Sequence, residues 1–204
     1  MHLNSMKYLF DLGGVFFDWN PEYFYKDIFK SKNELNYFLK YVCNNEWNIK
    51  QDAGRPIAKA IDELVYKFPK YQNEIKLYYS NHRNMIGSVF KDSIEVLETL
   101  KEKNINCYAL SNWSAETWIG MLDDYPFLKK FDGIIISGQE KVMKPDEEIY
   151  QIAIDRYELI PNESIFIDDN LDNINAAKKL GFKTIHLIDA FQIKKEINQL
   201  FLKV

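Results

Sequence analysis

Acidic side chains stand at the ends of two short apolar segments, one near the start of the chain and one near its end. Asp11 follows YLF in the run FDLGGV, and Asp168 and Asp169 close the run FIDD. Carboxylates that meet at one place repel one another unless a cation neutralises them. Mg²⁺ is the expected cation, because it takes one or two protein carboxylates and completes its shell with water and phosphate oxygens.

Residues that can bind phosphate oxygens follow other segments. Ser111 and Asn112 come after CYAL, and Lys144 stands directly before Pro145, where we expect a helix to begin. Together they offer a hydroxyl, backbone amides and an ammonium group to the oxygens of a phosphoryl group. Asp11 is then placed to attack phosphorus as a carboxylate nucleophile.

These side chains also have purely structural interpretations. Asp11 could be a turn carboxylate, the acid pair could cap a helix, and Lys144 could be a solvated lysine before a helix. Ser111 and Asn112 could cap a helix that begins near Ser114, a role that is compatible with phosphate binding. Their occurrence together, each at a predicted strand end or helix start, favours a functional site.

The elements that must position these side chains alternate between strands and helices. Apolar segments bounded by turn residues predict buried parallel strands at residues 7–11, 106–111, 132–137, 164–169 and 183–188. Apolar residues at helical spacing predict helices around Ile94, Ile149 and Ile174, the last ending at Gly181. This alternation predicts a doubly wound α/β parallel sheet, which binds ligands beyond the carboxyl ends of its strands.

The stretch from about residue 18 to residue 90 interrupts the alternation, and its pattern is helical throughout. Asn20 followed by Pro21 is typical of a helix start, and an apolar stripe recurs at helical spacing from Ile57 to Phe68. We therefore expect a core domain and a small α-helical cap inserted after the first strand. The expected bounds are 1–17 and 91–204 for the core and 18–90 for the cap, with an amphipathic helix at residues 190–204.

Composition narrows the class of protein. Of the 204 residues, 47% are hydrophobic and 27% charged, which excludes disordered, collagen-like and disulfide-scaffold chains. The net charge of -4, without a run of Lys and Arg, argues against nucleic acid as a partner. No apolar run approaches the roughly 20 residues of a membrane span. Cys43 and Cys107 lack CxxC spacing, so we expect a reduced, cytoplasmic protein, as a monomer or homodimer.

Four motifs resemble, in order and spacing, those of the haloacid dehalogenase (HAD) superfamily of hydrolases. They are Asp11 in FDLGGV, Ser111 in ALSNW, Lys144 in MKPDEEIY, and Asp168 and Asp169 in FIDDNLDNINAA. The helical insertion resembles the C1 cap of that superfamily, and the resemblance extends from Tyr8 to about Leu187. It implies a Rossmann-like core with the first strand at its centre.

The resemblance also implies roles for individual residues. Asp11 would be the nucleophile and Lys144 a catalytic phosphate-binding residue, while the other phosphate contacts would come from Ser111, Asn112, Gly13 and Gly14. Magnesium would be held by Asp11, Asp169 and the carbonyl of Gly13, with Asp168 as a further ligand or as a support for the ligands. The substrate would be a small phosphorylated metabolite.

Gly13 departs from the usual pattern of the family. Most of its phosphatases carry a second Asp at this position, which protonates the leaving oxygen and then deprotonates water. General acid-base catalysis of this kind contributes about 10² to 10⁴ in rate, so its loss would slow the reaction or restrict it to good leaving groups. A subgroup with DLGN or DLGG includes a glucose 1-phosphate phosphatase and resembles this sequence most, which implies a sugar phosphate as substrate.

Two other functions stay open. A metal-independent 2-haloacid dehalogenase is one, although such enzymes lack the acid pair that Asp168 and Asp169 provide here. A phosphate-binding or regulatory domain that has lost turnover through Gly13 is the other. Response-regulator receivers combine similar residues, but their acid pair precedes the nucleophile.

Several further residues are candidates for support or for substrate selection. Asn173 lies one helical turn after Asp169, where it could orient Lys144 or the metal shell or could lie on a solvated face. The candidates for selecting substrate are Trp19, Asn20, Trp47, Gln51, Arg55 and Trp113. Cap aromatic residues also commonly pack within the cap. His2, His82 and His186 show no partner spacing and are interpreted as structural or exposed.

Overall fold

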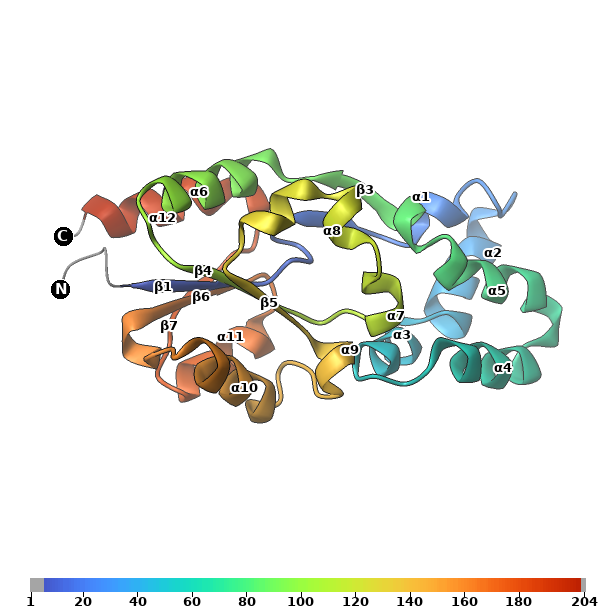
Figure 1. The fold of residues 1–204 in the computed structure, drawn as a ribbon. Helices are drawn as coiled ribbons and strands as arrows, with labels where there is room; N and C mark the ends of the chain where they lie inside the picture. The colour runs from blue at the N-terminus through green and yellow to red at the C-terminus, as the bar shows by residue number, and fades with distance from the viewer. Residues whose placement is uncertain (1–5, 203–204) are drawn as a thin grey trace.

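The computed structural model describes residues 6–202 and has five parallel strands in one central sheet (Figure 1). The strand order is β5-β4-β1-β6-β7, so the first strand is central, as expected. The strands are β1 (Lys7–Phe10), β4 (Cys107–Ser111), β5 (Gly133–Ile136), β6 (Ser164–Asp168) and β7 (Lys183–His186). Each falls within a segment predicted from the sequence, and β4 and β6 are buried along their whole length.

Helices cover both faces of the sheet, which confirms the α/β class. On one face lie α6 (Lys91–Glu102) and α12 (Ile193–Leu202), and on the other lie α10 (Glu147–Tyr157) and α11 (Leu171–Lys179) (Figure 1). Gly181, at φ +92°, follows the end of α11 as predicted. α10 begins two residues after the expected Pro145, because Asp146 still has extended backbone with ψ 134°.

Short elements complete the core. The helices are α7 (Ala115–Trp118), α8 (Met121–Asp124) and α9 (Ser137–Glu140). The 3-10 turns are η5 (Pro126–Lys130), η6 (Pro161–Glu163) and η7 (Ala190–Gln192). The predicted C-terminal helix is formed by η7 and α12, which bury Ile193 and Ile197. The side chains of Leu200 and Phe201, which are part of the predicted helix, are not among those that the structure describes. His2 also lies outside the described residues.

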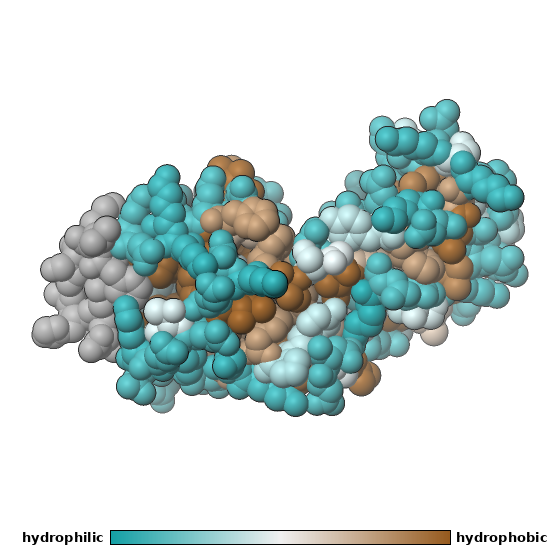
Figure 2. Space-filling model, turned by 90° about the horizontal axis from the view of Figure 1, so that it is seen from above, coloured by the Kyte–Doolittle hydropathy of each residue, from teal (hydrophilic) through white to brown (hydrophobic). Residues whose placement is uncertain are grey.

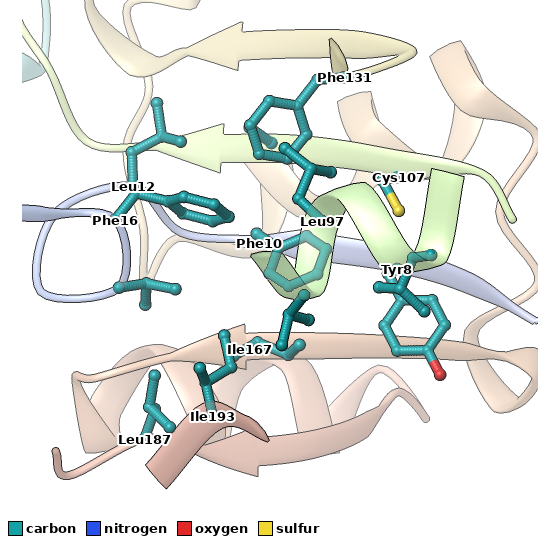
Figure 3. Close-up of a cluster of buried hydrophobic side chains, with 14 of the residues drawn as sticks. Tyr8, Phe10, Leu12, Phe16, Leu97, Cys107, Phe131, Ile167, Leu187 and Ile193 are labelled. Atoms are coloured by element: carbon teal, nitrogen blue, oxygen red, sulfur yellow. The ribbon is translucent and has the colours of Figure 1, made fainter. Parts of the chain in front are cut away.

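The central strand is packed on both of its faces. Tyr8 and Phe10 point into a cluster beneath α6 and α12, where Phe10 contacts Phe131 edge to face at 6.0 Å between ring centres (Figure 3). Leu9 points the other way, into the cluster beneath α10 and α11. Since successive side chains of a strand alternate between faces, both clusters hold β1 in register. The residue after the strand, Asp11, is thereby held in place.

The insertion after β1 forms a separate helical lobe at the carboxyl edge of the sheet (Figure 1), and the surface is hollowed between the two parts (Figure 2). Its helices are α1 (Glu22–Tyr25), α2 (Lys32–Tyr37), α3 (Asn45–Asp52), α4 (Ile57–Lys67) and α5 (Gln72–Ser80). Its turns are the π-helical η2 (Phe38–Val42), η3 (Pro69–Tyr71) and η4 (His82–Met85). This lobe has a hydrophobic cluster of its own, which includes Phe38 and Tyr78.

The expectation of a purely helical insertion is wrong at both of its ends. β2 (Phe17–Trp19) pairs antiparallel with β3 (Ile86–Val89), with an irregularity between Asp18 and Trp19. The two strands lie where the chain leaves the core and where it returns. They are too short to show alternation, and β3 contains Gly87, a residue of low strand propensity. The pairing joins segments about 70 residues apart. Local sequence patterns do not indicate contacts at that separation.

Within residues 6–202, no helix is both long and apolar enough to cross a bilayer. Cys43 and Cys107 are buried free thiols.

Candidate active site

Asp11 lies directly beyond the central strand with its carboxylate almost fully buried. Its backbone N–H donates to the carbonyl of Ile167 at 2.8 Å, which continues the pairing of β1 with β6. The Oδ1 atom accepts a hydrogen bond from the Leu12 N–H at 2.7 Å and lies 2.9 Å from Lys144 Nζ. Neighbours on three sides therefore fix the orientation of the predicted nucleophile.

Lys144 is 1% exposed, which excludes the solvated interpretation. Its Nζ lies 2.9 Å from Asp11 Oδ1 and 2.7 Å from Asp168 Oδ2. Burial alone lowers the pKa of Lys144, but the two carboxylates more than offset this, so the net direction is upward. The lysine is therefore a permanent cation between the first and last motifs.

The side chain of Asn112 positions Lys144 by binding the backbone of the lysine. The Asn112 amide donates to the Lys144 carbonyl and accepts from the Lys144 N–H, each at 2.9 Å. Ser111 is buried beside it, and its Oγ has no hydrogen-bond partner within the described residues. Neither side chain caps α7, whose N-cap residue is Ser114. The unpartnered hydroxyl of Ser111 fits an oxygen-rich ligand such as phosphate.

Asp168 is occupied on both carboxylate oxygens. Oδ2 pairs with Lys144, and Oδ1 accepts the backbone N–H of Asn170 at 2.8 Å. Asn173, buried rather than solvated, holds Nδ2 3.0 Å and 3.1 Å from these two oxygens. The helix cap is Asn170, not either acid, so capping does not explain the pair.

Asp169 directly follows β6, and its side chain lies against Gly14. A Cβ atom added to Gly14, whose φ is +67°, would overlap the Asp169 carboxylate. A Cβ on Gly13 would instead meet nothing within 4 Å. The two glycines thus have different roles, since Gly14 admits the carboxylate and Gly13 leaves space open beside it.

Burial governs the protonation of the acidic cluster. It raises the pKa of Asp11 to about 7; the Lys144 charge opposes the rise, and Asp168 and Asp169 add to it. The pKa of Asp169 is also raised, by burial and then by the Asp168 charge. A cation bound here would favour the ionised forms.

The donor set fits magnesium. Asp11, Asp168 and Asp169 each offer a carboxylate oxygen, and these atoms lie within 4.8 Å of one another. One lysine charge does not neutralise three carboxylates. Because Asp168 is already bound by Lys144, Asn170 and Asn173, the oxygens best able to accept a hard cation belong to Asp11 and Asp169.

A cavity of about 340 Å³ opens above the acidic cluster. The predicted residues that line it are Asp11, Gly13, Gly14, Trp19, Asn112, Trp113, Asp169 and Asn173. The remaining lining residues include several that sequence reasoning missed, namely Asn45, Asn48 and Asp52 of α3 and His82 of η4. The three on α3 are spaced at i, i+3 and i+7, so a polar helix face was the available signal.

The cap residues meet the core beside this cavity. Asp52 accepts a hydrogen bond from Ser137 Oγ on its carbonyl at 2.6 Å, and its carboxylate accepts the backbone N–H of Ser114. Burial raises the pKa of Asp52 to about 7, against which the Ser114 hydrogen bond acts. Arg83 Nε lies 2.8 Å from Asp124 Oδ2, a second link between cap and core. These links join the cap to the core beside the cavity.

Three aromatic side chains form one wall of the cavity. The rings of Trp19 and His82 stack at 5.9 Å, and His82 meets Trp113 at 5.4 Å. His82 and Trp113 are 9% and 6% exposed. Burial, and then the charge of Arg83, lower the pKa of His82 to about 4, so its imidazole is neutral at neutral pH.

Other candidates for substrate selection do not line this cavity. Arg55 Nε donates to Gln51 Oε1 at 2.6 Å, and its NH1 pairs with Glu63 at 3.0 Å. Trp47 and Gln51 are buried within the cap, where the Trp47 Nε1 donates to the Ala60 carbonyl at 3.2 Å. Asn20 accepts the N–H of Glu22, in keeping with the predicted helix start. These residues stabilise the cap as the structure stands.

Comparison with known proteins identifies one family of hydrolases. The haloacid dehalogenase-like hydrolase family matches residues 8–187. A sesquiterpene phosphatase of Aspergillus oryzae is 26% identical over 194 residues, which cover 94% of each chain. A phosphorylated carbohydrates phosphatase of Thermotoga maritima is 22% identical over 87% of this chain and 82% of its own. An (S)-2-haloacid dehalogenase of Burkholderia cepacia is 33% identical, but over 49% of this chain and 43% of its own.

The fold has a solved counterpart in a HAD family enzyme of Bacteroides thetaiotaomicron, crystallised as a magnesium complex. The two structures superpose with a TM-score of 0.72 at 22% identity, over 89% of this chain and 92% of the other. This likeness supports the fold described above.

Proposed function

The chain belongs to the haloacid dehalogenase-like hydrolases, and on that basis we propose that it hydrolyses a small phosphomonoester with the help of magnesium. The observation that carries the proposal is the acidic cluster. Three carboxylates offer oxygens within 4.8 Å of one another, and the buried Lys144 pairs with only two of them, Asp11 and Asp168. Such an excess of negative charge beside a nucleophile suits a bound cation and an anionic substrate.

Asp11 begins the reaction. One of its carboxylate oxygens attacks phosphorus, and the bond between phosphorus and the leaving oxygen breaks as the new bond forms. The leaving oxygen takes its proton from water, because position 13 carries no carboxyl group. A water molecule then attacks phosphorus and gives up a proton to the hydroxide left by the first step; the bond to Asp11 breaks, and inorganic phosphate departs with the carboxylate restored.

The other residues hold the phosphoryl group. Lys144 and the Ser111 hydroxyl bind its oxygens, and Asn112 and Asp168 keep Lys144 in position. Asp11, Asp169 and the carbonyl of Gly13 would hold magnesium, which supplies positive charge beside the transferring oxygens. The cap excludes bulk water from the cavity.

A sugar phosphate is the proposed substrate. The Thermotoga maritima relative is named for phosphorylated carbohydrates, and the DLGG motif resembles that of a sugar phosphatase subgroup. The cavity of about 340 Å³ combines aromatic rings with Asn45, Asn48 and Asp52, groups suited to a ring that bears hydroxyls.

The test is release of p-nitrophenol from p-nitrophenyl phosphate with magnesium and after chelation. We expect activity that chelation abolishes and Asp11→Asn removes, while Asp172→Asn, an exposed acid on α11, retains it. Activity that survives chelation or Asp11→Asn would contradict the mechanism. Chloride release from 2-chloropropionate without metal would instead support a dehalogenase, a function favoured by the Burkholderia cepacia relative.

A third outcome separates catalysis from binding. Phosphate binding with magnesium and without multiple turnovers would identify a binding or regulatory domain. A single-turnover measurement that traps aspartyl-phosphate distinguishes this outcome from an inactive preparation.

A further inference from the structure

Three side chains that line the cavity each hold a buried nitrogen atom without a hydrogen-bond partner within the described residues: Trp19 Nε1, His82 Nδ1 and Trp113 Nε1. We propose that this Trp19–His82–Trp113 cluster recognises the leaving group by hydrogen bonds to its oxygen atoms, and so selects an uncharged oxygen-bearing ring over a hydrocarbon. The inference rests on the proposed phosphatase function and assigns a specificity-determining role to three side chains.

Unpartnered donors are uncommon in a folded chain. An indole N–H can only donate, and buried polar groups nearly always have a partner, because a lost hydrogen bond to water is otherwise uncompensated. The chain supplies such a partner elsewhere, since buried Trp47 donates from Nε1 to the Ala60 carbonyl at 3.2 Å. Two indoles of the same kind remain unpartnered where they line one cavity, which points to a partner that enters with the ligand.

The cluster is assembled from cap and core and lines the same cavity as Asp11. Trp19 belongs to β2, His82 to η4 and Trp113 to the loop after β4, so cap and core both contribute. Phe17 packs edge to face against Trp113 at 5.6 Å between ring centres. Trp113 follows Ser111 by two residues and lines the same cavity as Asp11, so a leaving group on a phosphoryl group at Asp11 would enter the cavity that this wall bounds.

The charge of the cavity selects the chemical class. No Lys or Arg is among the described residues that line it, whereas Asp52 is. A second anionic group on the substrate would meet no cation there. His82 is neutral, and its Nδ1 donates or accepts according to its tautomer, which suits a hydroxyl because a hydroxyl does both. A hydrocarbon chain would leave all three nitrogen atoms unpartnered.

The first experiment observes the indole protons directly. The chain has four tryptophans, Trp19, Trp47, Trp113 and Trp118, so ¹H–¹⁵N spectra resolve four indole N–H signals. Asp11→Asn protein with magnesium is titrated with inorganic phosphate, then separately with glucose 1-phosphate and with cyclohexyl phosphate. These two esters share a six-membered ring and differ in its oxygens.

We expect glucose 1-phosphate to move the Trp19 and Trp113 signals downfield, as a new hydrogen bond does. Cyclohexyl phosphate and inorganic phosphate should leave them near their free positions. The signals of Trp47 and Trp118, which do not line the cavity, are internal controls. Equal responses to the two esters, or no response to glucose 1-phosphate, would overturn the proposal.

The second experiment measures selectivity. The ratio of kcat/KM for glucose 1-phosphate to that for cyclohexyl phosphate should be about 100 or more in the natural protein. Trp19→Phe and Trp113→Phe, which keep an aromatic ring but lose the N–H, should each lower the ratio about tenfold. Trp47→Phe is the matched control and should leave it unchanged.

The two experiments separate the inference from the proposed function. Hydrolysis of p-nitrophenyl phosphate with unchanged selectivity in both variants would refute the cluster and leave the phosphatase intact. Lack of all hydrolysis would refute the phosphatase, and the indole signals would still report whether the cluster binds the ring oxygens.

Discussion

Gly14 lies directly against the carboxylate of Asp169, so closely that any side chain at position 14 would occupy the space of that carboxylate. The backbone of Gly14 also has φ +67°, which L side chains rarely adopt. This contact makes the second glycine of FDLGGV part of the proposed metal site. The first glycine, Gly13, faces open space.

We predict that Gly14→Ala weakens magnesium binding while Gly13→Ala does not. The new methyl group would turn the Asp169 side chain away, and displacing a metal-supporting group typically costs 10- to 100-fold in affinity. The measurement is the magnesium concentration that gives half-maximal activity in each variant. Equal magnesium dependence in the two variants would show that Asp169 does not hold the ion.

Gly13→Asp should raise turnover on alkyl phosphates, because the open space at position 13 admits a carboxyl group that can protonate the leaving oxygen. General acid catalysis predicts an increase of about 10²-fold in kcat. Hydrolysis of p-nitrophenyl phosphate, whose leaving group needs no proton, should change little. Gly13→Asn provides the same shape without the acid, and an equal gain with it would refute the acid-base explanation.

Lys144→Met should both destabilise and inactivate the protein. It would leave Asp11 and Asp168 buried without their shared cation, and breaking a buried ion pair in this way costs about 3–5 kcal/mol. Because Lys144 lowers the pKa of Asp11, any residual activity should shift to higher pH. Urea unfolding and the pH dependence of kcat/KM are the measurements, with exposed Lys178→Met as the control.

The stability of the cap–core contact should depend on pH through Asp52. Its pKa is raised by burial from 3.8 to about 7, so the folded state favours the protonated form. The stabilising contribution is complete below about pH 4 and is lost as pH rises through 7. Over that interval, about three pKa units at about 1.4 kcal/mol each give a loss of up to about 4 kcal/mol.

Asp52→Asn keeps an acceptor for the Ser114 N–H and removes this titration. The difference in unfolding free energy between the natural protein and Asp52→Asn should therefore fall between pH 4 and pH 8. Exposed Asp62→Asn on α4 should show no such trend. A constant difference across the interval would mean that Asp52 is ionised in both states.

The core and its chemistry were readable from the sequence because both are encoded locally. Each buried strand is a continuous apolar run, and the residue that matters stands at the end of that run, as Asp11 does after β1 and Asp169 after β6. Parallel strands bring their carboxyl ends to one edge. Sequence order therefore sufficed to assemble Asp11, Ser111, Lys144 and the acid pair into one candidate site.

The tertiary structure decided which of the two adjacent acids contacts Lys144. The family resemblance implied that Asp169 is a magnesium ligand and left Asp168 as either a further ligand or a support; in the structure only Asp168 is held by Lys144 and Asn173. Which acid meets the lysine depends on the direction of each side chain as the chain leaves β6. That direction is set by packing against neighbouring strands and by α11.

Local sequence patterns also could not predict the aromatic wall of the cavity. His82 stacks on Trp19, 63 residues earlier in the chain, and contacts Trp113, 31 residues later. Arg55, chosen from the sequence for substrate selection, instead pairs with Gln51 and Glu63 in the cap. Apolar periodicity records which face of a helix is buried, but not which distant element covers it. The sequence alone thus determined the sheet and its reactive residues, and the packing of cap on core decided what surrounds them.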